Sequence, residues 1–136
     1  DIDLYQAYKA LHLGLNVVKE GGVIILVAEC REGVGNGVGH QNYHEWMGKY
    51  KTKKEMQEEL EKEFTIGGHK AYYQLKAMEK AKLFLVADMP KEEVEGLFRL
   101  KYARTPDMAL EEAYKIMGKN AKVLVIPEGI TTLSSV

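Results

Sequence analysis

The chain has 136 residues, 46% of them hydrophobic and 29% charged, which is the composition of one globular domain that buries a single core. Its 19 basic and 20 acidic residues leave a formal net charge of −1 and are spread along the chain, so neither a nucleic-acid footprint nor a polybasic membrane anchor is expected. No apolar run approaches the roughly 20 residues of a membrane span, and the single cysteine excludes an internal disulfide and favours a cytoplasmic protein.

The first predicted element is an amphipathic helix that ends at the glycine pair 21–22. Asp1 or Asp3 supplies the capping carboxylate, and glycine accepts the left-handed backbone that closes a helix. Gln6 and Lys9 lie one turn apart, on a face that the core of the domain does not need. The core-facing stripe recurs at three- and four-residue steps and consists of Leu4, Ala7, Leu11, Leu15 and Val18.

A continuous apolar run over residues 23–28 follows, and it is typical of a strand buried on both faces. Four glycines then alternate with other residues from Gly33 to Gly39. This loop is not the dinucleotide fingerprint, because the required third small residue falls on Val38 or on His40. A flexible loop at the end of a strand and a loop that binds an anion remain equally good interpretations.

Three helices are predicted next, over residues 41–48, 51–63 and 69–81. At the first, His40 and His44 are four residues apart with Glu45 nearby and form a candidate metal pair, against the alternative of surface or packed histidines. The second is rich in Lys and Glu and is typical of a solvated helix. His69 lies in the first turn of the third.

The last third of the chain continues the alternation of strands and helices. A short helix is expected to run from Pro90 to Leu97, and a longer one starts with Thr105 as its cap and Pro106 in its first turn. The expected fold class is α/β: a three-layer α/β/α, Rossmann-like domain with a mainly parallel sheet of about four strands. Its four strand segments are 23–28, 82–87, 99–103 and 121–127.

Three runs of residues carry a resemblance to a known family. They are Asp-x-Asp-Leu-Tyr-Gln-Ala-x-Lys-Ala at 1–10, Gly-Gly-x-Ile-Ile-Leu-Val-Ala-Glu-Cys-x-Glu-Gly-x-Gly at 21–35, and Phe-Thr-Ile-Gly-Gly-His-Lys-Ala at 64–71. In their order and spacing they resemble the C-terminal domain of nickel-dependent lactate racemase and its 2-hydroxyacid racemase and epimerase relatives. The resemblance covers most of the chain.

The resemblance implies a division of labour between two domains. In that family a nickel pincer nucleotide accepts a hydride from the substrate carbon, and the nickel ligands and catalytic histidines belong to the N-terminal part. Residues 1–136 are then one α/β domain, the C-terminal fragment of a two-domain protein, without the cofactor and inactive alone. The start of the chain at a helix cap, with no strand before it, also favours a fragment. The implied partners are the N-terminal domain and a small 2-hydroxyacid.

The resemblance also implies site residues: Tyr5, Gln6 and Lys9, with His69, would contact substrate or cofactor across the cleft. A lysine beside an amide donor can hold a carboxylate by charge-assisted hydrogen bonds. The alternative is that Gln6 and Lys9 are ordinary solvated residues. His69 stands where some relatives are expected to carry an aromatic residue, which leaves the substrate open. A rival function is a stand-alone nucleotide-binding or regulatory module that uses the glycine loop.

Overall fold

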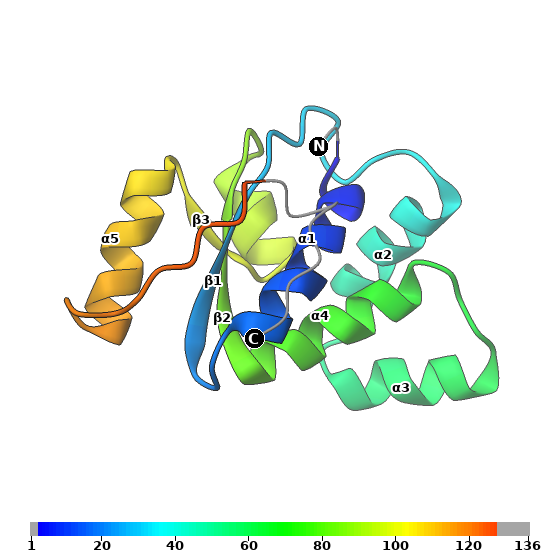
Figure 1. Cartoon of the computed structure of the whole chain (residues 1–136). Coiled ribbons are helices and arrows are strands. Elements are labelled where there is room, and N and C mark those ends of the chain that lie inside the picture. Colours follow the sequence, from blue (N-terminus) through cyan, green and yellow to red (C-terminus); the bar gives the residue numbers. More distant parts are fainter. Residues whose placement is uncertain (1–2, 128–136) are drawn as a thin grey trace.

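A parallel sheet of three strands separates two layers of helices in the computed structural model, which describes residues 3–127 (Figure 1). The strands are β1 (Gly22–Val27), β2 (Ala81–Val86) and β3 (Lys101–Ala103), and β2 is the central one. All six residues of β1 pair with β2, whereas β3 pairs only with the second half of β2, from Phe84 to Val86.

The larger helical layer covers one face of the sheet, and a single helix covers the other (Figure 1). The larger layer holds α1 (Leu4–Val17), α2 (Val38–Lys49), α4 (Gly68–Lys80) and the short π-helical turn η1 (Glu93–Leu97), with α3 (Lys53–Lys62) packed on α4. The opposite face carries α5 (Pro106–Met117). The expected three-layer α/β/α architecture is therefore confirmed.

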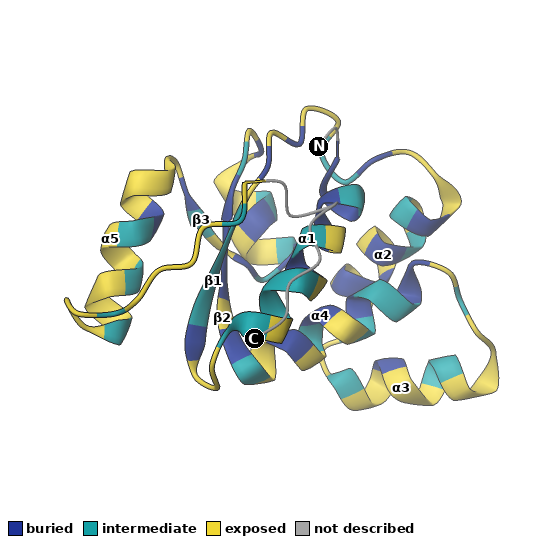
Figure 2. Ribbon diagram, in the orientation of Figure 1, coloured by how far each residue is buried: buried dark blue, intermediate teal, exposed yellow. Residues whose placement is uncertain are grey.

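Side chains of β2 alternate between the two layers, as a pleated strand requires. Leu83 and Leu85 belong to the main core cluster with α1 and α4, whereas Phe84 and Val86 pack against Ala109 of α5. The burial colours of Figure 2 follow this division, with the dark interior between the sheet and the larger layer. The apolar run from Leu83 to Val86 therefore buries side chains on both faces of the sheet.

A polar network lies inside the larger layer. The Tyr8 hydroxyl donates to Gln74 Oε1, and the Tyr43 hydroxyl lies 2.7 Å from that of Tyr8 and 2.6 Å from Gln74 Oε1. The amide of Gln74 donates to the carbonyl of Phe98 at 2.6 Å. Burial raises the pKa of both tyrosines, so their hydroxyls stay protonated and available as donors. The network joins α1, α2 and α4 to the segment after η1.

The first helix begins as predicted and ends early. The side chain of Asp3 accepts a hydrogen bond from the backbone of Gln6 at 2.8 Å, so Asp3 is the cap, whereas Asp1 lies outside the described residues. The helix ends at Val17, not at the glycine pair. A β-branched residue at the C-cap, Val18, already has extended backbone, and Gly21 with φ of 77° turns the chain into β1.

The predicted fourth strand over residues 121–127 is wrong. This segment lies outside the sheet, and Leu124 and Val125 are 65% and 74% exposed (Figure 2). β-branched and apolar residues fit a pleated, half-buried surface, but they make a strand only where a neighbouring strand pairs with their backbone groups. The predicted strand over 99–103 does form at the sheet edge, shortened to β3.

The helices of the described part, residues 3–127, include none that is both long and apolar enough to cross a membrane.

Candidate functional site

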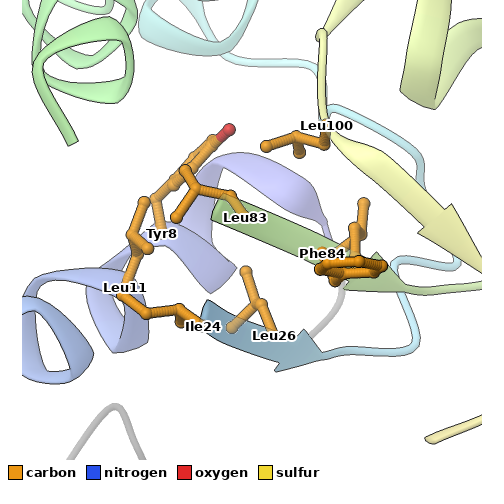
Figure 3. Close-up of a pocket in the computed structure, with 8 residues that line it drawn as sticks. Tyr8, Leu11, Ile24, Leu26, Leu83, Phe84 and Leu100 are labelled. Atoms are coloured by element: carbon orange, nitrogen blue, oxygen red, sulfur yellow. The ribbon is translucent and has the colours of Figure 1, made fainter. Parts of the chain in front are cut away.

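The interior hollow between α1 and the sheet is too small for a ligand. Its volume is about 10 Å³, and apolar side chains line most of it. In Figure 3, Leu11 from α1 and Leu26 and Leu83 from the sheet point toward one another around it. It is a packing gap of the core.

A wider, open groove of about 500 Å³ lies beyond the carboxyl ends of the strands. Ligands of open α/β sheets commonly bind at this edge. Its polar lining comes from Glu29, Asp88 and Arg104, and Glu29 is already paired with Arg31 at 3.2 Å. None of the four predicted site residues lines this groove.

The predicted site residues lie instead where the starts of α1 and α4 meet. We call this surface the α1–α4 seam and define it by Tyr5, Gln6 and Lys9 of α1 and His69 and Lys70 of α4. Two contacts join the helices: Lys70 Nζ donates to the Tyr5 carbonyl at 2.8 Å and lies 3.7 Å from the centre of the Tyr5 ring. The structure therefore brings together two segments that are 65 residues apart in sequence.

Tyr5 is a largely buried member of the seam, with 9% of its surface exposed. Its ring lies 4.3 Å from that of His40 and 6.3 Å from that of Tyr43, measured between ring centres. Burial raises the pKa of its hydroxyl. In this structure Tyr5 packs against α2 and supports Lys70, and its predicted contact with a ligand stays a prediction.

Gln6 and Lys9 flank Tyr5 on α1. Gln6 is half-buried and uses its backbone N–H on the Asp3 cap, whereas the Lys9 side chain is exposed. Lys9 stands four residues after Tyr5, and side chains at that spacing share a helix face. The ammonium of Lys9 is therefore directed to the side of α1 on which Lys70 rests.

Lys70 is the residue that the sequence interpretation missed. Burial, with the nearby charge of Lys9 as the second cause, lowers the pKa of its ammonium to about 8. The carboxylate of Asp3 opposes this shift only partly. The sequence signal was the position next to His69 in the Gly-Gly-His-Lys-Ala run, but the contact with Tyr5 is visible only in three dimensions.

His69 lies beside Lys70 in the first turn of α4 and is half-buried. Its Nδ1 accepts a hydrogen bond from the backbone of Gly67 at 3.0 Å, and its ring lies 5.3 Å from that of Phe64. Burial lowers the pKa of the imidazole, and the charge of Lys70 acts in the same direction. A hydrogen bond with the Thr65 backbone opposes this shift, and the net lowering favours the neutral imidazole at pH 7. Because Nδ1 accepts from Gly67, the proton of the neutral ring is on Nε2.

The glycine loop from Gly33 to Gly39 closes the start of α1. The carbonyls of Gly33 and Val34 accept from the first helical N–H groups, those of Leu4 at 2.7 Å and Tyr5 at 3.4 Å. Gly35, with φ of 104°, has no room for a side chain, since a Cβ there would lie 2.0 Å from the His40 ring. The loop caps the N-terminus of α1 and packs against the His40 ring.

The two histidines of the candidate metal pair have different neighbours. His40 Nε2 lies 3.3 Å from a carboxylate oxygen of Asp3, whereas the ring of His44 meets Phe98 edge-on at 5.8 Å. Within residues 3–127 no three side chains of His, Cys, Asp or Glu come together in a way that could hold a metal ion.

Comparison with known proteins identifies the family of the chain. The family model of the lactate racemase C-terminal domain matches residues 1–134. The chain is 28% identical to the lactate racemase of Thermoanaerobacterium thermosaccharolyticum over 98% of its own length and 31% of that protein. It is 30% identical to the lactate racemase of Lactiplantibacillus plantarum over 96% of its own length and 31% of that protein.

A solved structure is similar as well. The lactate racemase apoprotein from Thermoanaerobacterium thermosaccharolyticum superposes with a TM-score of 0.82 at 27% sequence identity, covering 98% of this chain and 32% of that one. The chain spans about a third of the length of the curated relatives that it matches.

Proposed function

Because this chain belongs to the family of lactate racemase C-terminal domains, we propose that it forms one wall of the active-site cleft of a 2-hydroxyacid racemase or epimerase. The opposite wall is a separate N-terminal domain of a longer protein. The substrate is a small 2-hydroxyacid of the lactate type, and the reaction depends on a nickel pincer nucleotide.

The observation that carries this proposal is the contact between Lys70 and Tyr5. It joins two of the three runs that resemble the family, residues 1–10 and 64–71, so that Tyr5, Gln6, Lys9 and His69 contribute to one surface. A substrate carboxylate can be held there by the exposed ammonium of Lys9, and the neutral His69 can donate from Nε2.

Exposed apolar side chains support a domain partner at this surface. Phe64 is 68% exposed and touches the His69 ring, and Val38 at the start of α2 is 70% exposed. Ile66 is also exposed, and its carbonyl is tied to Asn42 of α2 at 3.0 Å. Exposed apolar groups of this kind beside a polar site are typical of a surface covered by another domain.

The described residues suit the cofactor as anion-binding neighbours rather than as metal ligands. No described cluster supplies three metal-binding side chains, whereas Lys9 and Lys70 present positive charge to anionic groups. We therefore assign the nickel ligands to the N-terminal domain. The bound cofactor would supply the hydride acceptor, and the seam residues would hold and orient the carboxylate of the hydroxyacid.

The test is a chiral assay of lactate interconversion with the longer protein and with residues 1–136 alone. The longer protein is expected to convert D-lactate to L-lactate, and the isolated chain to be inactive and to lose added nickel on dialysis. Racemisation or stoichiometric nickel retention by residues 1–136 alone would overturn the division between the two domains.

The alternative function, a stand-alone nucleotide-binding module, is less well supported by the structure of the glycine loop. In the glycine loop the N–H groups of Gly33 and Gly35 donate to Cys30 and Glu32, and two loop carbonyls cap α1. Those groups are occupied before any phosphate arrives. Micromolar binding of NAD or ATP to the chain, measured by calorimetry, would restore this alternative.

A further inference from the structure

We propose that Lys70 is a second anion-binding residue of the α1–α4 seam and that, with Lys9, it selects a 2-hydroxyacid that carries two carboxylates. This inference rests on the proposed function, because it specifies the substrate class of the same site. It assigns a role to Lys70, which lies in the run 64–71 but was not among the residues predicted to contact a ligand.

The geometry sets the two ammonium groups on one surface. Lys70 Nζ is fixed by the Tyr5 carbonyl at 2.8 Å and by the Tyr5 ring at 3.7 Å. Lys9 follows Tyr5 by one helical turn and lies on the same side of α1. An ammonium has three donors, so Lys70 can keep its bond to the carbonyl and still donate to a ligand.

The positive charge at the seam is not neutralised by an ion pair. Within residues 3–127, none of the ion pairs includes Lys9 or Lys70. The nearest acidic influence on Lys70 is Asp3, which is itself paired with His40. The remaining titratable neighbours, Tyr5 and His69, are uncharged at pH 7 and supply no counter-charge. Burial raises the pKa of the Tyr5 hydroxyl, which keeps it neutral, and lowers the pKa of the His69 imidazole, which removes its positive charge.

Two cations on one surface that repel each other favour a ligand with two negative charges. Burial and the charge of Lys9 lower the pKa of Lys70 to about 8. Its ammonium is therefore less stable at this site than in water when no anion is bound. A monocarboxylate held by Lys9 removes only part of this repulsion. A dicarboxylate can give one carboxylate to each ammonium, with a charge-assisted hydrogen bond at both ends.

The experiment measures anion binding by NMR on residues 1–136, with lysine labelled with ¹³C at Cε. Malate is the dicarboxylate probe, lactate the monocarboxylate, and inorganic phosphate the non-substrate dianion. We expect malate to bind at least tenfold more tightly than lactate at pH 7 and to raise the pKa of Lys70 from about 8 toward 10.

Three variants make the result specific. Lys70→Met should reduce malate binding to the level of lactate, whereas Lys76→Met, which removes a lysine from the exposed side of the same helix near the Tyr73 ring, should change nothing. Lys70→Arg keeps the charge at every accessible pH. It should preserve the preference for malate and remove the roughly tenfold loss of malate affinity that the wild type shows between pH 7 and pH 9.

Equal binding of malate and lactate, or an unchanged pKa of Lys70 in saturating malate, would overturn the proposal. Tighter binding of phosphate than of malate would overturn the substrate class and reassign the pair to a phosphate group. These outcomes are independent of racemase activity. A loss of racemisation in Lys9→Ala, together with no preference for malate, would leave the proposed function standing and remove only this inference.

Discussion

The Lys70 ammonium lies over the Tyr5 ring at 3.7 Å and donates to the Tyr5 carbonyl, so the start of α4 is joined to the start of α1. One of these two contacts is made to the backbone, which any residue at position 5 would offer. The seam can thus keep its shape while its side chains change.

Replacing Lys9 by alanine in the longer protein should cost about 2–3 kcal/mol of transition-state stabilisation, a roughly 30- to 150-fold fall in kcat/KM. The reason is the loss of the proposed charge-assisted contact between the Lys9 ammonium and a substrate carboxylate. Gln6→Ala should act in the same direction but less, because a neutral donor contributes less. Steady-state kinetics measure both.

The control for Lys9 is Lys19→Ala, beyond the far end of α1, which should leave kinetics unchanged. The thermal midpoints of all three variants should stay close to that of the wild type, since an exposed lysine contributes little to folding. Full activity of Lys9→Ala would show that Lys9 is an ordinary solvated helix residue and does not bind the substrate.

The stability of the chain should rise with pH because of Lys70. Its pKa falls from 10.5 to about 8 on folding, so between these values the unfolded chain binds more protons than the folded one. The penalty of the buried charge is complete below pH 8 and disappears as the pH approaches 10. Since Lys70 is only half-buried, solvent screening reduces the gain to about 1 kcal/mol.

Urea denaturation at pH 7 and pH 9.5 tests this gain by comparing the wild type with Lys70→Arg. The arginine stays charged at both values, so its stability should lack the increase. The buried tyrosines contribute equally to both proteins and cancel in the difference. An identical pH dependence would show that the ammonium of Lys70 is not destabilised by folding.

Gln74→Ala should lower the free energy of unfolding by about 2–4 kcal/mol. It removes the partner of the Tyr8 and Tyr43 hydroxyls and of the Phe98 carbonyl, all of which are buried. Gln57→Ala on α3, where the side chain is exposed and reaches only Glu61, is the matched control and should cost under about 0.5 kcal/mol. Chemical denaturation of the two variants measures both changes in the free energy of unfolding and tests the prediction.

Gly67→Ala should destabilise the chain by about 3 kcal/mol or more. Besides its φ of 89°, a Cβ at this position would lie 2.0 Å from the carbonyl oxygen of Gly39. Gly118 also has a positive φ, 96°, with ψ of 158°, and no atom lies within 4 Å of a Cβ placed there, so Gly118→Ala has a backbone cost of about 1–3 kcal/mol and no steric clash. Similar losses in both variants would mean that the Gly39 backbone yields easily.

Local patterns in the sequence predicted much of the fold because they follow from short-range physics. The Asp3 cap, the Thr105 cap and the run that became β2 all depend on neighbours in sequence, and all formed. The segment 121–127 has the same apolar, β-branched character and lies outside the sheet, because pairing is a long-range property.

The candidate site also has a part that could be predicted from the sequence and a part that could not. Helical spacing predicted that Gln6 and Lys9 lie one turn apart, and family resemblance supplied Tyr5 and His69. The approach of Lys70 to Tyr5 spans 65 residues and depends on how α4 returns to α1, so no sequence period contains it. The lowered pKa of Lys70 results from burial at that contact, so it could not be predicted from the sequence either.

The close approach of the Gly67 and Gly39 backbones holds the starts of α4 and α2 together through main-chain atoms that do not depend on the side chains at positions 69 and 70. Positions 69 and 70, which directly follow this close approach, can therefore exchange their side chains without altering the path of either helix. A change of two neighbouring codons would be enough to give the α1–α4 seam a different charge while the scaffold is retained.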